Sequence, residues 1–210
     1  FLPDYRPFSP AKERTAWQGL PLRVKQRFLQ AGEAALQTPL APLPLSLWLD
    51  FTRTGQRTPW EDAYFSRRAR LCALVCAECL EHTGRFLDAI TDTVWALCEE
   101  SAWQLPAHNS YIRDTPQLPL PDTTRPIVDL FAAETGALLA LTRYLLSDAL
   151  DAAAPGITAR MEQALNARIL TSYFTSHFWW MGNGAEPMCN WTVWCTQNVL
   201  LTTFLMPWSV

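Results

Sequence analysis

Aromatic, imidazole and amide side chains gather in two segments of the chain that lack helical periodicity. The first segment holds Trp103, His108 and Asn109. The second holds or adjoins His177, Trp179, Trp180, Asn190, Trp191 and Trp194. Indole rings stack on the apolar faces of sugars, while amides and imidazoles bond hydroxyl and carboxylate groups. These residue types indicate a carbohydrate-binding cleft. The alternative is that the tryptophans are core residues that cap helix ends, since Trp is commonly buried.

Few carboxylates stand out as candidates for acid–base chemistry. Glu99 and Glu100 lie at the expected C-terminal end of a helix, where the helix dipole disfavours negative charge. Glu134 lies among apolar residues, so it either points into a central bore or reaches water. The chain contains no GxSxG, P-loop, GxGxxG or HExxH motif. We therefore predict no cofactor.

The charge and hydropathy of the chain argue against two broad classes of function. Its 17 Lys and Arg residues against 20 Asp and Glu residues give a net charge of −3, which leaves no basic field to hold a phosphate backbone. With 49% hydrophobic residues the chain can bury a core, yet its longest apolar runs fall short of the roughly 20 residues of a membrane span. We expect neither nucleic-acid binding nor a transmembrane helix.

The six cysteines are too sparse for a disulfide framework in a chain of this length. Cys72, Cys76 and Cys79 have the spacing i, i+4, i+7, which predicts one buried stripe of reduced thiols on a helix. His82 is the only imidazole near them, so we assign no metal site. Reduced thiols favour a cytoplasmic location, with a periplasmic or secreted protein as the alternative.

Start and stop signals of helices recur along the chain, and strand signals are nearly absent. Two helices open at Ser9-Pro10 and Leu20-Pro21. Later helices are expected at about 46–54, 58–82, 86–101, 127–150, 157–173 and from 190 onward, with irregular segments at 103–126 and 175–189. This pattern predicts an all-α fold of successive antiparallel hairpins, arranged as a helical (α/α) toroid or a solenoid. Six hairpins need twelve helices, so residues 1–210 are expected to form an incomplete toroid as the N-terminal part of a catalytic domain.

Two regions of the sequence resemble the heparinase II/III-like family of polysaccharide lyases. The first comprises WALCEESAWQLPAHN at 95–109 and DLFAAET at 129–135. The second comprises FWWMG at 178–182, CNWTVWC at 189–195 and NVL at 198–200. Together these motifs span about half of the chain in the family's order. Cys189 departs from the family pattern, because many members carry a second Asn at that position.

This resemblance implies an (α/α) toroid followed by a β-sandwich domain, and cleavage next to a uronate by β-elimination. In that chemistry the C6 carboxylate must be neutralised before the C5 proton can leave. Asn190 matches the neutralising position, and a plain helix N-cap is its alternative role. The resemblance also assigns residues to the sugar cleft: Glu100, Trp103, His108, Asn109, Trp180 and Trp191. The assisting tyrosine and histidine are expected beyond Val210, so the chain alone is expected to be inactive.

The expected partner is an acidic polysaccharide, and the open edge of an incomplete toroid is expected to favour self-association. Two other functions remain open. A glycoside hydrolase on the same fold would need two carboxylates flanking the bond, from among Asp50, Glu100 and Glu134. A noncatalytic binding or scaffold module is favoured if Trp103, Trp180 and Trp191 are all sealed inside the core.

Overall fold

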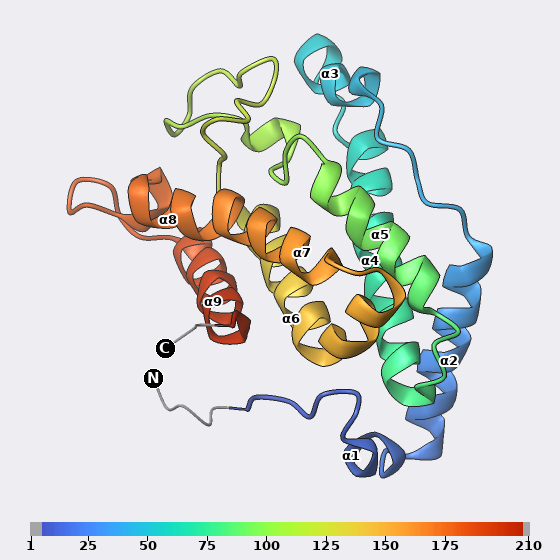
Figure 1. The fold of residues 1–210 in the computed structure, drawn as a ribbon. Coiled ribbons are helices and arrows are strands. Elements are labelled where there is room, and N and C mark those ends of the chain that lie inside the picture. Colours follow the sequence, from blue (N-terminus) through green and yellow to red (C-terminus); the bar gives the residue numbers. More distant parts are fainter. Residues whose placement is uncertain (1–5, 208–210) are drawn as a thin grey trace.

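The computed structural model describes residues 6–207, and every regular element in that range is helical (Figure 1). The α-helices are α1 (Arg14–Gln18), α2 (Leu22–Gln37), α3 (Leu45–Thr54), α4 (Thr58–Glu81), α5 (Leu87–Glu99), α6 (Leu130–Ala153), α7 (Ile157–Leu165), α8 (Thr171–Thr175) and α9 (Asn190–Leu205). A π-helical turn, η2 (Asn166–Leu170), joins α7 to α8, and two 3-10 turns, η1 (Pro106–His108) and η3 (Trp179–Met181), lie in the irregular segments. The prediction of an all-α chain is confirmed.

Local sequence signals account for most helix boundaries. Gly55 ends α3 with a φ of 79°, and His82 ends α4 with a φ of 56°, both in the left-handed region that closes helices. Asp129 caps α6, so this helix begins at Leu130, three residues later than expected. The first helix also begins later than predicted, because the backbone N–H of Ala11 donates to a carbonyl of α6 instead of to a helical turn.

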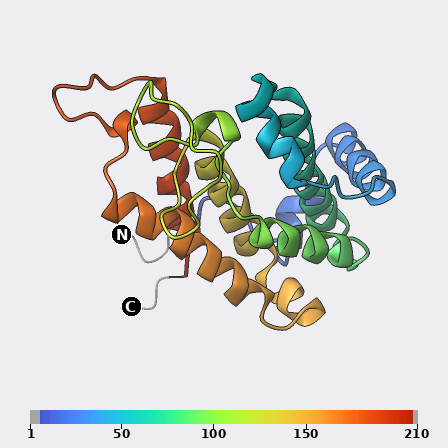
Figure 2. The same ribbon diagram turned by 90° about the horizontal axis from the view of Figure 1, so that it is seen from above.

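The longer helices form a row with a second set packed along it. Helix α6 contacts both α4 and α9, while α5 packs on α4 and α7 packs on α6. Viewed from above, α6 lies between α4 and α9, with α5 and α7 along one side of this row (Figure 2). Helices α4, α6 and α9 all begin at the end of the molecule that carries η1 and η3 (Figure 1). The two irregular segments therefore meet at the helix N-termini.

Two groups of buried apolar side chains stabilise this arrangement. The main core fills the space between α2, α4, α5, α6, α7 and α9. A smaller cluster lies where α3 and α4 meet the first irregular segment, and it contains Trp48, Trp60, Tyr64, Ala102 and Leu105. In this cluster the rings of Trp48 and Trp60 meet edge to face, with centroids 5.1 Å apart. The smaller cluster anchors the segment that carries His108.

The described helices carry neither a membrane span nor a disulfide. None of those in residues 6–207 is long and apolar enough to cross a bilayer. All six cysteines are free thiols. Within the same range, no three His, Cys, Asp or Glu side chains gather as metal ligands.

The expectation of a single buried stripe of thiols is wrong for Cys72, which is exposed, whereas Cys79 is buried and Cys76 is intermediate. The buried face of α4 follows Leu71, Leu74, Val75 and Glu78. Position 72 is turned by about 100° from position 71 on a helix, which rotates its side chain out of this face.

We predict that Cys72 is the most reactive thiol of the chain. A hydrogen bond from Cys76 lowers the pKa of Cys72, so the thiolate persists to a lower pH than in an ordinary thiol. Iodoacetamide at neutral pH should therefore label Cys72 at least about threefold faster in the native chain than in Cys76→Ala. This difference in labelling rate should disappear as the pH falls through the lowered pKa of Cys72, because the thiolate is then protonated. Peptide mass spectrometry measures both rates, and equal rates would contradict the prediction.

Candidate functional site

Asp129 organises the end of the molecule where the irregular segments meet. One carboxylate oxygen accepts the backbone N–H groups of Phe131 and Ala132, at 3.1 and 2.7 Å, and so caps α6. The other accepts the N–H of Leu105 at 3.2 Å and Nδ1 of His108 at 2.6 Å. Because Nδ1 donates to this buried carboxylate, Nε2 is the ring nitrogen left to bind a ligand or take up a proton.

A cavity of about 280 Å³ lies beside this histidine. Its wall includes His108, Trp179, Trp180 and Trp191. The Trp191 ring centroid lies 4.7 Å from that of His108 and 4.9 Å from that of Trp179. The guanidinium of Arg113 lies 5.1 Å from the Trp179 ring centroid at the same wall. Stacking faces, an oriented imidazole and a cation therefore surround one cavity.

Gln117 adds an unsatisfied acceptor to this wall. Its side-chain oxygen Oε1 is buried and has no hydrogen-bond donor among the described residues, while its Nε2 donates to the carbonyl of Thr115 at 3.3 Å. A buried acceptor without a donor costs about 1–3 kcal/mol. A ligand hydroxyl entering the cavity would supply the missing donor.

Asn190 is the first residue of α9, and it is exposed. The cap of α9 is Cys189, whose backbone N–H donates to the hydroxyl of Thr192 at 3.1 Å. The N-cap role for Asn190 is therefore excluded. The Thr192 hydroxyl in turn donates to the carbonyl of Trp180, which ties α9 to η3. Asn190 stands outside the cavity wall but directly before Trp191, at the positive end of a sixteen-residue helix dipole.

Three of the predicted cleft residues are buried and position the loops. Trp103 is 2% exposed, and its indole N–H donates to the carbonyl of Leu97 at 2.8 Å. Asn109 is 0% exposed and links Gln104 to the carbonyl of Leu118. Trp103 and Asn109 therefore lie outside the cavity wall beside His108. Trp180 is 1% exposed and donates to the carbonyl of Val128 at 2.9 Å, so it supports the wall from inside.

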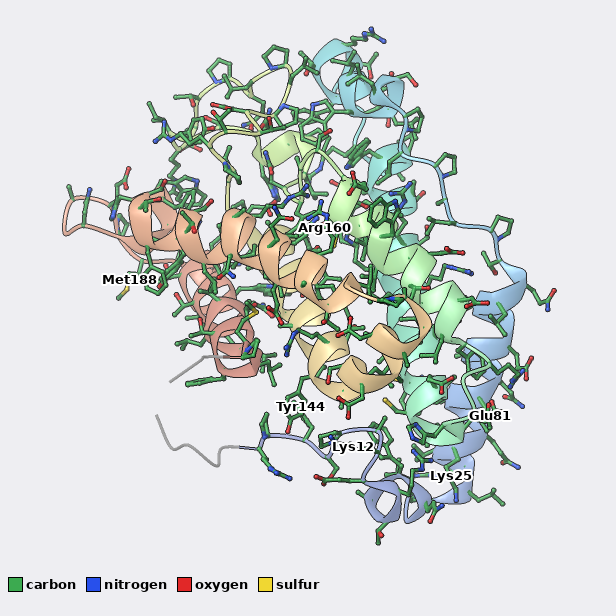
Figure 3. The ribbon with its side chains drawn as sticks, viewed as in Figure 1. Lys12, Lys25, Glu81, Tyr144, Arg160 and Met188 are labelled. Carbon is green, nitrogen blue, oxygen red and sulfur yellow. The ribbon has the colours of Figure 1, made fainter. Side chains whose placement is uncertain are left out.

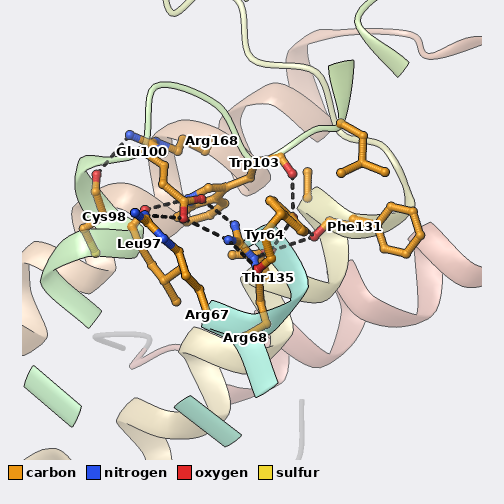
Figure 4. A network of polar contacts seen from close by, with 12 residues as sticks. Tyr64, Arg67, Arg68, Leu97, Cys98, Glu100, Trp103, Phe131, Thr135 and Arg168 are labelled. Atoms are coloured by element: carbon orange, nitrogen blue, oxygen red, sulfur yellow. Dashed lines mark hydrogen bonds and ion pairs between the residues drawn. The ribbon is translucent and has the colours of Figure 1, made fainter. Parts of the chain in front are cut away.

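Glu100 is part of a buried ion-pair network (Figure 4). Arg68 holds both carboxylate oxygens, at 2.9 and 2.5 Å, and Arg67 binds Oε1 at 3.1 Å. Arg68 also bonds the hydroxyl of Thr135, which accepts or donates a bond with the Tyr64 hydroxyl. Glu100 lines two other cavities and is absent from the wall beside His108. The arginines therefore hold this carboxylate away from the cavity beside His108.

The structure thus brings together His108, Trp180 and Trp191 of the predicted residues, with Asn190 next to them. Three contributors to the site were missed by sequence reasoning: Asp129, Arg113 and Gln117. Asp129 had a readable signal, since an Asp directly before an apolar helical run is typical of an N-cap. Arg113 and Gln117 lie in an irregular loop, where no periodicity indicates which side chains turn inward.

We predict that Asp129→Ala lowers the free energy of unfolding by about 2–4 kcal/mol, because it removes a cap and leaves buried donors unsatisfied. Asp129→Asn keeps a side chain that caps helices well, so it should recover about half of this loss while still weakening the bond to His108. Urea denaturation measures both values. Equal losses in the two variants would contradict a capping role for Asp129.

No model of a known protein family matches the chain, and no curated protein matches it. The functional argument therefore rests on the geometry of the site and on the motifs of the sequence.

Proposed function

We propose that this chain is the N-terminal helical portion of a polysaccharide lyase, similar to the heparinase II/III-like family, that cleaves uronate-containing polysaccharide by β-elimination. The observation that carries the proposal is the position of Asn190. Because Cys189 and Thr192 cap α9, the Asn190 amide is exposed beside an aromatic cavity and at a helix N-terminus. An amide donor and a positive dipole end together suit a carboxylate.

The chemistry assigns a task to each group around the cavity. A uronate ring stacks on Trp191, with its C6 carboxylate at Asn190. Neutralising this carboxylate stabilises the negative charge that develops when the C5 proton is removed. Gln117 accepts a sugar hydroxyl, and Nε2 of His108 binds a second polar group of the sugar. The tyrosine and histidine that would transfer protons in the family match no residue of this chain.

The helix arrangement supports the toroid part of the proposal. In an (α/α) toroid, inner helices run parallel and outer helices return between them, and α4, α6 and α9 with α5 and α7 follow this order. Val193 and Leu200 are 70% and 48% exposed on α9 and are seven residues apart, which places them on one side of the helix. We assign this exposed apolar face to contact with a further helical hairpin, or with a second copy of the chain when that hairpin is missing.

An oligosaccharide prepared from alginate tests the binding step on this chain. We expect it to quench tryptophan fluorescence in a saturable way, and we expect Trp191→Ala to weaken binding about tenfold or more. Trp95→Ala is the matched control, because Trp95 is 54% exposed on α5 and lies outside the cavity wall.

Two outcomes of this titration would contradict the proposal. If a neutral cello-oligosaccharide bound as tightly as the acidic one, the sugar carboxylate would not contribute to binding. That result would favour a noncatalytic binding module. If Trp191→Ala and Trp95→Ala bound the oligosaccharide with equal affinity, the cavity beside His108 would not be the binding site.

A further inference from the structure

Two adjoining cavities lie apart from the one beside His108. The larger, of about 590 Å³, has Trp48 and Trp60 in its wall, and the smaller, of about 140 Å³, has Arg160 and Arg168. The two cavities share the segment 99–102 and Thr123. Among the described residues, Ile127 alone lines both this pair and the cavity beside His108. One ligand with two chemically different parts can therefore fill the pair without entering the proposed sugar site.

The larger cavity is suited to an apolar body. Its volume falls within the roughly 300–1,000 Å³ that is typical of small-molecule sites, and most of its lining is hydrophobic. The edge-to-face contact of Trp48 with Trp60, and a hydrogen bond from the Trp48 indole to the carbonyl of Pro119 at 3.0 Å, fix the ring of Trp48. A rigid aromatic wall favours a ligand that presents a flat apolar surface.

Each cavity has a wall residue with a buried hydrogen-bond donor that lacks an acceptor. Nε1 of Trp60 is unpaired among the described residues, and Trp60 is only 7% exposed. Nη1 of Arg168 is also buried and unpaired within the same part of the chain. A buried donor without a partner costs about 1–3 kcal/mol, and more when it is charged. Both donors call for an acceptor atom that the described protein does not supply.

Arg168 is held at the smaller cavity by an unusual piece of backbone. It lies in the π-helical turn η2. Such turns are rare in proteins, and those that occur are often found at functional sites. Its Nη2 donates to the carbonyl of Cys98 at 3.0 Å (Figure 4). The same carbonyl accepts Nη2 of Arg160, a residue of α7 (Figure 3), at 2.8 Å. The guanidinium carbon lies 4.9 Å from the Trp103 ring centroid. These contacts hold the cation in a fixed position.

Among the described residues, three carboxylates line the smaller cavity, and none of them pairs with Arg168. Asp122 accepts hydrogen bonds from the backbone N–H and the hydroxyl of Thr124. Glu100 is bound by Arg67 and Arg68, and Glu99 pairs with Arg160 at 3.1 Å. No ion pair within residues 6–207 includes Arg168. Burial lowers the pKa of Arg168, as expected for a cation whose charge is poorly compensated. An anionic group in this cavity would compensate that charge and bond Nη1.

We propose that the two cavities together bind an amphipathic organic anion. Its apolar body lies against Trp48 and Trp60 in the larger cavity, and its carboxylate accepts a hydrogen bond from Arg168 in the smaller one. This site is separate from the proposed lyase site, so either proposal can fail without the other.

The probe is 2-naphthoate, titrated into the whole chain by calorimetry and followed by the indole N–H resonances in ¹⁵N NMR. We expect saturable binding that shifts the Trp60 resonance, which Trp60→Phe identifies by its loss. The neutral analogue 2-naphthalenemethanol should bind about tenfold or more weakly, because a hydrogen bond from a charged donor is lost.

Two variants and their controls separate the two parts of the site. Arg168→Gln should lower the affinity for 2-naphthoate about tenfold or more and leave the affinity for 2-naphthalenemethanol unchanged. Arg143→Gln is the control, because it alters an arginine that is paired with Glu162, and it should change neither affinity. Ala96→Phe fills the larger cavity from its wall and should abolish binding of both compounds, whereas Asp92→Phe adds the same ring to the exposed surface of α5. The proposal is overturned if 2-naphthoate does not bind at millimolar concentration, or binds Arg168→Gln and Ala96→Phe as it binds the unaltered chain.

Discussion

Replacing Glu100 with alanine is expected to lower the free energy of unfolding by about 3–5 kcal/mol. The side chains of Glu100, Arg67 and Arg68 are 6%, 12% and 10% exposed, so both guanidinium groups are largely removed from bulk water. Two buried guanidinium groups would be left without their counter-ion. This loss is a large part of the roughly 5–15 kcal/mol that stabilises a typical domain. Urea denaturation of the native chain and the variant measures it.

Glu99→Ala is the matched control for this experiment. Glu99 is the preceding residue and also pairs with an arginine, but its side chain is 51% exposed. An exposed pair contributes about 0–1 kcal/mol, so the control should unfold almost as the native chain does. If the two variants lost the same stability, the network around Glu100 would not be the structural element that we describe.

The buried network also bears on the hydrolase alternative. Both oxygens of Glu100 are bound by arginines, so this carboxylate cannot flank a glycosidic bond without breaking its ion pairs. Glu134 is a better acid candidate, since desolvation raises its pKa against the opposing effect of a hydrogen bond from Trp194. Glu134 does not line the cavity beside His108, and among the described residues Asp114 is the one carboxylate in that wall. Asp114 has a side chain 88% exposed, without the burial that tunes such pairs.

The sequence predicted the helices well because their ends are encoded locally. Gly55 and the segment after Glu81 stop their helices through backbone conformations that neighbouring residues do not alter. The start of α1 was misplaced because Ala11 bonds to a residue 134 positions away, and such a contact leaves no local signal. The π-helical turn at Asn166–Leu170 was missed for a similar reason, since tertiary contacts select it over an α-helical turn.

The site was predicted less well than the fold, and burial explains the difference. Residue type indicates that Trp103 and Trp191 can stack on a sugar, but only packing decides that Trp103 is 2% exposed and lies outside the wall beside His108, while Trp191 is part of that wall. The interaction-module alternative would gain support if both rings and Trp180 were sealed, and Trp191 is only partly buried. The role of Asn190 depended on whether Cys189 or Asn190 is the N-cap of α9. The sequence alone did not decide between these neighbouring positions.

The most direct test of the lyase proposal is the ultraviolet absorbance of the unsaturated uronate product. We would measure it with heparan, chondroitin, hyaluronan and alginate, using a protein that contains this chain with the proposed toroid and β-sandwich, and its Asn190→Ala variant. The account predicts rising absorbance with at least one substrate and a rate about 10²–10³-fold lower in the variant, the loss expected when one donor to a developing anion is removed. Release of reducing ends without absorbance, or an undiminished rate in Asn190→Ala, would contradict it.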